Sequence, residues 1–98
     1  MDKITLTGDP GDLRLILRGE ITVEDAAQLK DAVIETIREG RPLAVCVAEL
    51  TRLDAAALQV LVAGAREAKQ AVVSGAVAPA WSDAFTRYAI HDPFIPSP

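Results

Sequence analysis

The sequence is poor in the residues that most often carry out chemistry. Its 98 residues include one cysteine and one histidine. Cys46 lies in the apolar run LAVCVA and has no second cysteine to pair with, so we read it as a reduced, buried thiol. His91 stands beside Asp92 near the C-terminus, with no nucleophile close in sequence, and we read it as a solvated side chain. These residues do not supply the converging ligands that a metal site needs.

Motifs for catalysis and cofactor binding are also missing. The chain contains no GxxxxGK[ST] loop that would hold nucleotide phosphates. Asp83 is a further candidate for a general base, but its position favours the outer side of a helix. We therefore expect no enzymatic activity, no catalytic residues, no cofactor and no metal.

Positive charge and long apolar runs are scarce as well. The chain has 10 Lys and Arg residues against 14 Asp and Glu residues, a net charge of −4, and its pI is about 4.8. This balance argues against nucleic-acid binding, which needs clustered Lys and Arg. No apolar run reaches the length of a membrane span, and the opening MDKITLTGD has no apolar signal-peptide core. We therefore expect a cytoplasmic protein that does not insert into a membrane.

What the sequence does contain is alternating periodicity. KITLT and LRLILR alternate apolar and polar residues on either side of the turn-rich GDPGD, which predicts a β-hairpin. From Thr22, the apolar spacing changes to three and four, which predicts a capped helix that ends near Gly40. LAVCV and AVVSGAV predict buried strands, the first covered on both faces, and the segments AAALQVLVAGAREAK and PAWSDAFTRYAI predict two more helices.

This order of elements predicts an α/β fold. A hairpin followed by alternating helices and strands gives a mixed sheet of about four strands with helices packed on it. We expect a single domain over residues 1–98. The tail at 91–98 is rich in proline and is expected to be irregular, either docked through Phe94 and Ile95 or free.

Aromatic residues are few, and three of the four stand in the last expected helix. Trp81, Phe85 and Tyr88 follow one another at spacings of four and three. This helical spacing favours a stripe that packs into the core. A ligand pocket lined by these rings is the alternative.

The stretch RLDAAALQVLVAGAREAK carries the main functional signal. Asp54 is expected to be the N-cap of a helix that begins at the carboxyl edge of the sheet, where α/β proteins keep their functional surfaces. Ala56, Gln59, Ala63 and Arg66 fall on the side away from the apolar stripe. This outer face is small and uncharged over its first two turns, so we interpret it as a surface for protein contact.

Three segments together resemble the STAS domain family. They are LRLILRGEITVEDAAQLKDAV, LAVCVAELTRLDAAALQVLVAGAREA and VVSGAVAPAWSDAF, and the likeness extends from about Ile4 to Phe94. The fold of that family is shared by anti-sigma-factor antagonists, sulfate-transporter cytoplasmic domains and a small subunit of bacterial lipid-transport ABC complexes.

The resemblance points to a phosphorylation site that this chain has lost. In the family the helix after the central strand usually starts Asp-Ser-Ser-Gly or Asp-Thr-Ala-Gly, and a hydroxyl there is phosphorylated by a kinase or contacts the partner. Placed on this sequence, Asp54 matches the acidic residue, Ala55 and Ala56 replace the hydroxyl residues and Ala57 replaces the glycine. Methyl groups cannot accept phosphate, and Thr51 is the nearest hydroxyl.

The resemblance implies a non-enzymatic, protein-binding adaptor similar to anti-sigma-factor antagonists, not regulated by phosphorylation at that site. It would act in bacterial signalling, by partner switching or linked to chemotaxis, on a kinase, an anti-sigma factor or a signalling protein. One alternative is a STAS subunit that binds the ATPase of an ABC lipid transporter, and another is a small-ligand or nucleotide sensor. The oligomeric state stays open. The expected partner-binding residues are Arg52, Asp54, Ala55, Ala56, Gln59 and Ala63.

Overall fold

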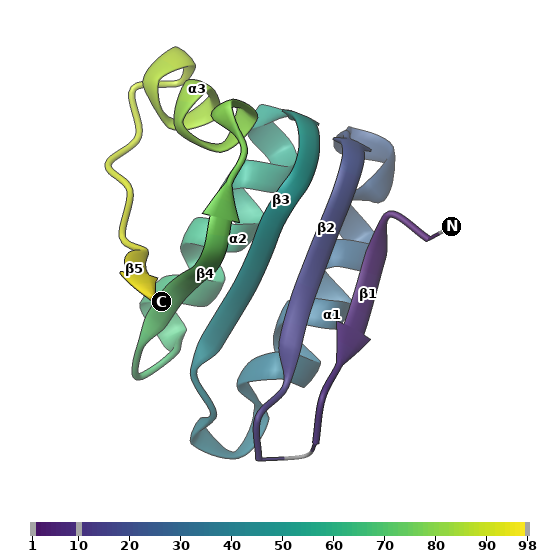
Figure 1. Cartoon of the computed structure of the whole chain (residues 1–98), viewed down its shortest axis with the longest axis vertical. Coiled ribbons are helices and arrows are strands. Elements are labelled where there is room, and N and C mark those ends of the chain that lie inside the picture. The colour runs from purple at the N-terminus through teal and green to yellow at the C-terminus, as the bar shows by residue number, and fades with distance from the viewer. Residues whose placement is uncertain (1, 10, 98) are drawn as a thin grey trace.

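A five-stranded sheet in the order β1-β2-β3-β4-β5 forms one layer of the computed structural model, which describes residues 2–9 and 11–97 (Figure 1). Strand β1 pairs antiparallel with β2, and every other neighbouring pair is parallel. The elements are β1 (Ile4–Thr7), β2 (Arg14–Ile21), the 3-10 helix η1 (Val23–Asp25), α1 (Ala26–Ile37), the 3-10 helix η2 (Arg38–Gly40), β3 (Leu43–Leu53), α2 (Ala55–Glu67), β4 (Ala71–Val77), α3 (Pro79–Arg87) and β5 (Ile95–Ser97). The expected α/β fold, with its N-terminal hairpin and mixed sheet, is confirmed.

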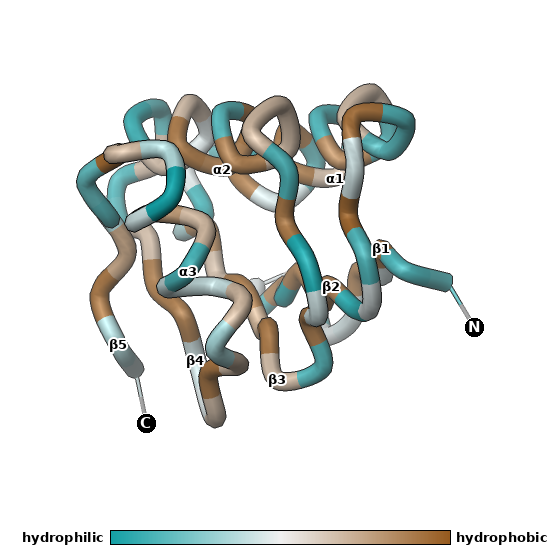
Figure 2. The backbone as a smooth tube through the Cα atoms, turned by 90° about the horizontal axis from the view of Figure 1, so that it is seen from above, coloured by the Kyte–Doolittle hydropathy of each residue, from teal (hydrophilic) through white to brown (hydrophobic). Residues whose placement is uncertain are grey.

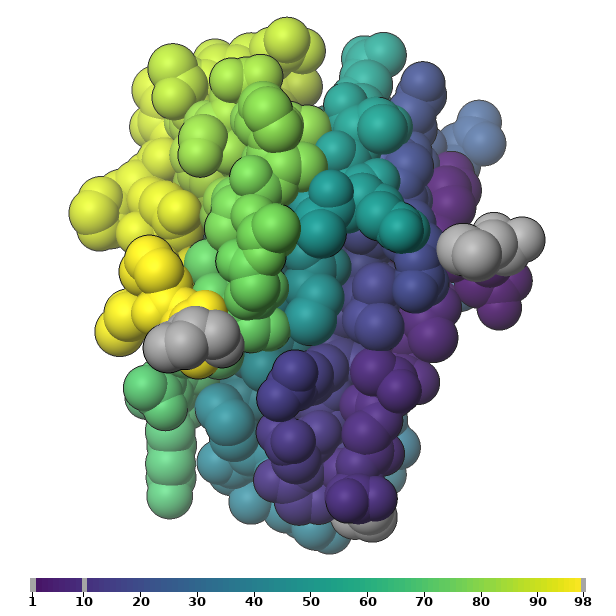
Figure 3. Space-filling view, in the orientation of Figure 1, coloured from purple at the N-terminus to yellow at the C-terminus, as the bar shows by residue number. Residues whose placement is uncertain are grey.

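Helices α1 and α2 lie side by side on one face of the sheet (Figures 1 and 2). The expectation that β3 would be covered on both faces is wrong. On the open face, Ala44 and Cys46 are half-buried, and strand residues reach the molecular surface there (Figure 3). The cause is the strand order: right-handed crossovers that advance in one direction across a sheet place their helices on the same face.

The tail also differs from expectation, because it contains a fifth strand. Strand β5 runs parallel to β4, with Ile95 opposite Val72. Just before it, Phe94 is 5% exposed, and its ring meets that of Trp81 edge-on at 5.1 Å between centroids. The tail up to Ser97 therefore docks through Phe94, whereas Ile95 points outward with 56% of its surface exposed; Pro98 lies outside the described residues.

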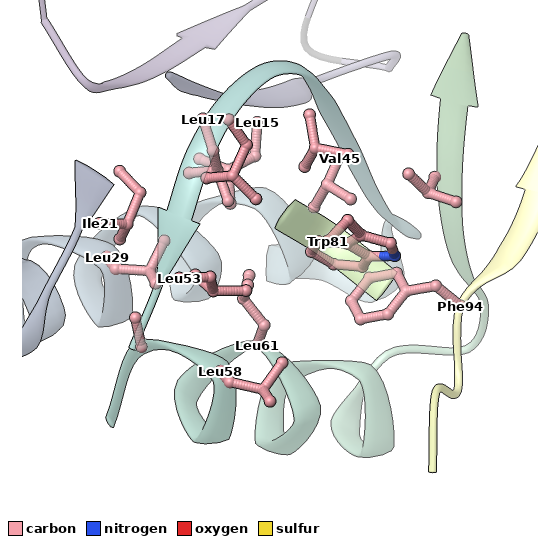
Figure 4. Close-up of a cluster of buried hydrophobic side chains, with 14 of the residues drawn as sticks. Leu15, Leu17, Ile21, Leu29, Val45, Leu53, Leu58, Leu61, Trp81 and Phe94 are labelled. Atoms are coloured by element: carbon pink, nitrogen blue, oxygen red, sulfur yellow. The ribbon is translucent and has the colours of Figure 1, made fainter. Parts of the chain in front are cut away.

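The aromatic stripe of α3 belongs to the core, as the helical spacing predicts. Trp81 and Phe85 are buried, and their rings pack edge-on at 5.1 Å. Tyr88 is half-buried at the end of the same stripe. Figure 4 shows Trp81 and Phe94 within the apolar core between the sheet and α2. The core around them is aliphatic and includes Leu15, Leu17, Ile21, Leu29, Val45, Leu53, Leu58 and Leu61.

Gly64 lets α1 and α2 approach each other closely. A Cβ atom built on Gly64 would overlap Cγ1 of Val33 and would lie 3.3 Å from Cδ2 of Leu43. Val33 is 3% exposed and β-branched, so its side chain has little freedom to move aside. The glycine therefore forms a low floor between the two helices.

Gly64→Ala is expected to lower the free energy of unfolding by about 1–2 kcal/mol. Overpacking costs about 1–3 kcal/mol, and the overlap with Val33 places this case in the upper part of that range, at about 2–3 kcal/mol. The better helix propensity of alanine recovers about 1 kcal/mol. Urea unfolding followed by circular dichroism measures the change. Val33→Ala in the same chain should restore part of the loss, since it removes the methyl group that the new Cβ meets. A Gly64→Ala protein as stable as the wild type would contradict this packing.

The start of the first helix has the capping box that Thr22 predicts. The Thr22 hydroxyl accepts a hydrogen bond from the backbone N–H of Glu24, and the Thr22 backbone N–H donates to the Asp25 carboxylate at 2.8 Å. The Lys3 ammonium group also donates to this carboxylate, at 2.9 Å, and so ties the chain before β1 to the helix. The Thr22 N–H, followed by Lys3, holds the pKa of Asp25 below its ordinary value.

Asp25→Asn is therefore expected to destabilise the fold at neutral pH and much less in acid. A carboxylate with a lowered folded-state pKa stabilises the fold above its unfolded pKa of about 3.9, and this contribution is lost as the pH falls through the folded-state value. The difference in unfolding free energy between wild type and variant should be constant above about pH 5 and should shrink toward about pH 2. Urea unfolding at several pH values measures it. A difference that does not change with pH would show that the charge of Asp25 does not act in this way.

Candidate partner-binding site

The expected site lies where β3 ends and α2 begins. The backbone N–H of Asp54 donates to the carbonyl oxygen of Ile21 at 3.0 Å, which fixes the start of α2 beside the end of β2. The carbonyl oxygen of Asp54 accepts from the N–H of Leu58 at 2.9 Å, the first hydrogen bond of the helix. Because β2 and β3 are parallel, their carboxyl ends meet at this edge, as the sequence predicts.

Asp54 occupies the N-cap position, but its side chain does not cap. It makes no hydrogen bond to the first-turn amides of α2. The carboxylate instead accepts from Nε of Arg52 at 3.2 Å, an interaction on the protein surface. Asp54 is therefore the N-cap by position, as expected, but its carboxylate is directed to the arginine two residues earlier and not to the amides of the helix. The first-turn amides are left without a side-chain acceptor.

The outer face of α2 is small and uncharged over its first turns. Ala55 and Ala56 are half-buried, whereas Gln59 and Ala63 are exposed. The opposite side of the helix faces the core, with Ala57, Leu58, Leu61 and Val62 buried. The structure thus brings the predicted residues, together with Arg52 and Asp54, onto one continuous surface, the α2 contact face: Arg52, Asp54, Ala55, Ala56, Gln59 and Ala63.

Beside this face lies an apolar groove between α1 and α2, which the sequence reasoning missed. Its volume is about 380 Å³. Ile34 leaves 47% of its surface exposed in the groove wall, next to the buried stripe of α1. The sequence signal that would have revealed the groove is this isoleucine, which stands beside the helical apolar stripe and not within it. The groove is lined by Lys30, Val33, Ile34, Ile37, Gln59, Val60, Ala63, Gly64 and Glu67.

Of the remaining candidate residues, Thr51 and Asp83 line one small pocket beside the end of β3, and His91 lines another. The Sγ atom of Cys46 lies 3.2 Å from Oγ of Ser74, on the open face of the sheet, and His91 is exposed. Thr51 is exposed near the end of β3, before the helix start. Within the described part of the chain, no three metal-ligating side chains gather, and no helix has the length and apolar character needed to cross a bilayer.

The sequence as a whole matches a known family. The family model described as "Mlab, STAS domain" matches residues 4–96. The chain belongs to the STAS domain family. The expected resemblance is thereby confirmed over almost the whole chain, whereas none of the curated proteins matches it in sequence.

Solved structures of other STAS-like proteins share the fold. The anti-sigma factor antagonist SpoIIAA, in its unphosphorylated form, is 14% identical, with a TM-score of 0.70 over 97% of this chain and 87% of that one. An anti-sigma factor antagonist from Mycobacterium paratuberculosis is 18% identical, with a TM-score of 0.73 over 97% of this chain and 84% of that one. At these identities the likeness concerns the fold, and the contact residues of this STAS domain stay predictions.

Proposed function

We propose that this STAS domain is a non-enzymatic adaptor that binds a protein partner through the α2 contact face. The observation that carries the proposal is the helix start itself: Ala55 and Ala56 present methyl groups at a sheet edge, and neither residue carries a charge or a hydroxyl that would interfere with close approach. Gln59 and Ala63 extend this small surface along the helix. Such a face suits a partner that fits by shape and by burial of apolar atoms.

The same residues make the adaptor permanently competent to bind. A phosphoryl group adds a charge of about −2 and three acceptor oxygens, which drives off one partner or recruits another. Ala55 and Ala56 cannot receive it. In this chain the binding surface therefore keeps one charge state, and control of the complex falls to the partner or to the amount of protein.

No phosphate is expected on this chain after incubation with ATP and a kinase that it binds. Intact-mass spectrometry measures the result, and Ala56→Ser, which returns a hydroxyl to the helix start, is the matched variant. A phosphate on the wild-type chain at Thr51, the nearest exposed hydroxyl, would show that the adaptor is switched after all.

The partner that fits this proposal best is a kinase or an anti-sigma factor in bacterial cytoplasmic signalling. The support is the shared fold: the two solved structures described above are of anti-sigma factor antagonists. A signalling protein linked to chemotaxis belongs to the same class of partner. Affinity purification from the native cell, followed by mass spectrometry, identifies the partner, and recovery of soluble kinase-type proteins would support this assignment.

The uncharged helical part of the contact face, Ala55, Ala56, Gln59 and Ala63, also favours a second candidate, a permanent subunit of an ABC lipid transporter bound to its ATPase. Permanent interfaces are more apolar than transient ones, and a permanent subunit needs no phosphoacceptor. This candidate uses the same α2 contact face. Recovery of a transporter ATPase with membrane components in the same purification would favour it over the signalling role.

A further inference from the structure

The groove between α1 and α2 combines an apolar floor with charged ends. Val33, Gly64 and Val60 form the deeper part, and Ile34 and Ala63 stand exposed along its sides. The floor stays low because residue 64 has no side chain. The result is an elongated apolar surface that follows the two helices.

The charges at its ends have opposite signs. Helices α1 and α2 both connect neighbouring parallel strands, so they run in the same direction. Lys30, in the first half of α1, and Gln59 therefore stand at one end, while Ile37 and Glu67 stand at the other. Lys30 and Glu67 are exposed, and neither has an ion-pair partner among the described residues.

We propose that this groove binds an amphipathic helix of the protein partner, with an acidic residue seated on Lys30 and a basic residue on Glu67. The inference rests on the proposed function, because Gln59 and Ala63 belong both to the α2 contact face and to the groove. An amphipathic helix in an apolar groove is a common mode of peptide recognition. The unpaired charges at the two ends set the direction of the bound helix.

The spacing along the groove fits two turns of such a helix. From Gln59 to Glu67 the axis of α2 advances about 12 Å, and from Lys30 to Ile37 that of α1 advances about 10 Å, at 1.5 Å per residue. Residues seven positions apart in a partner helix are separated by about 10 Å and lie on one face. The partner helix therefore carries its acid and its base seven residues apart, with apolar side chains three and four residues after the first.

Three synthetic peptides test the proposal. They are about 16 residues long, cross-linked on the outer face to stay helical, and identical except at the two charged positions, which are Asp and Lys, Lys and Lys, or Asp and Asp. Titration into ¹⁵N-labelled protein follows the amide signals of Ile34, Val60 and Ala63. The Asp and Lys peptide should bind about two- to fivefold more tightly than either of the others, because each of the others replaces one exposed ion pair with a contact between like charges. On Lys30→Glu, the preference should pass to the Lys and Lys peptide.

A charged side chain in the groove should also block it. Ile34→Asp, at a position already 47% exposed, is expected to reduce binding of the Asp and Lys peptide at least tenfold. Gln28→Asp, at an exposed position of α1 outside the groove, is the matched control and should leave binding unchanged. Equal binding of all three peptides, or signal changes confined to other surfaces, would overturn the proposal.

Two other occupants give distinct results that would also overturn it. Decanoate that shifts the groove signals, while the peptides bind without preference, would identify a site for small apolar molecules. Shifts of the same signals on dilution of the protein alone would identify a second copy of this chain. The complex with the natural partner separates the two proposals. If Ile34→Asp has no effect on this complex while Ala56→Glu abolishes it, the groove proposal is wrong and the proposed function stands. Binding that survives Ala56→Glu would sink the proposed function instead.

Discussion

Ala56→Glu is expected to weaken the complex with the protein partner at least about 30-fold. Ala56 is the second residue of α2 and is half-buried at the centre of the α2 contact face. A carboxylate there must lose its water when the partner docks, and Arg52, the cation just before the helix, already pairs with Asp54. A loss of about 2 kcal/mol or more, typical of a central contact position, corresponds to this factor.

The variant should remain folded, which makes the binding result interpretable. Glutamate in the first turn of a helix interacts favourably with the helix dipole, so α2 itself is not weakened. Ser82→Glu places the same charge at an exposed position in the first half of α3, away from the contact face, and is the matched control. Isothermal titration of both variants against the purified partner measures the effect. Affinity of Ala56→Glu within twofold of the wild type would leave the contact face without a role.

Trp81→Ala is expected to lower the free energy of unfolding by about 3–5 kcal/mol. Trp81 is 1% exposed and holds Phe85 and Phe94 edge-on, so its ring joins α3 to the segment before β5. Removing it opens a cavity between these elements, and the few aromatic residues of the chain offer nothing to fill it. For a chain of 98 residues this is a large share of the total stability.

Trp81→Phe should cost much less than Trp81→Ala. It keeps a ring in the core and removes an indole N–H that has no hydrogen-bond partner among the described residues. Urea unfolding of the three proteins, monitored by circular dichroism because the fluorophore is lost, measures the series. If Trp81→Ala lowers the free energy of unfolding by less than about 1 kcal/mol, the packing of Phe94 on Trp81 does not hold the tail in place.

Periodicity in the sequence was enough to predict most of the layers of this fold. The alternation around residues 4–7 and 13–18, the capping box at Thr22 and the aromatic spacing from Trp81 each correspond to an element in the structure. These signals are local, since each depends on residues close in the chain. The class of fold follows from their order, because few topologies connect such elements.

Features that depend on distant residues were not predictable in this way. Strand β5 contains a proline and is only three residues long, and it directly follows Phe94, which docks on Trp81. The apolar run of β3 gives no sign that one face stays open, since that depends on the order of the strands. At the helix start, residue order predicts Asp54 as the N-cap but not that its carboxylate pairs with Arg52.

The candidate site was predictable in its position and not in its extent. Helical spacing places Ala56, Gln59 and Ala63 on one outer face, and the structure has them there. The groove needs two helices to lie parallel and close, a contact that depends on Gly64 fitting against Val33. A single glycine in a helical pattern does not predict which side chain packs against it.

Methyl cross-saturation tests most directly whether the partner docks on α2. The chain is deuterated with protonated alanine methyl groups, bound to an unlabelled partner, and the partner's protons are saturated. The methyl signals of Ala55, Ala56 and Ala63 should lose intensity, whereas those of Ala44, on the open face of the sheet, and Ala89, after α3, should keep it. Loss at Ala44 or Ala89 with intact signals from the three α2 alanines would contradict the account.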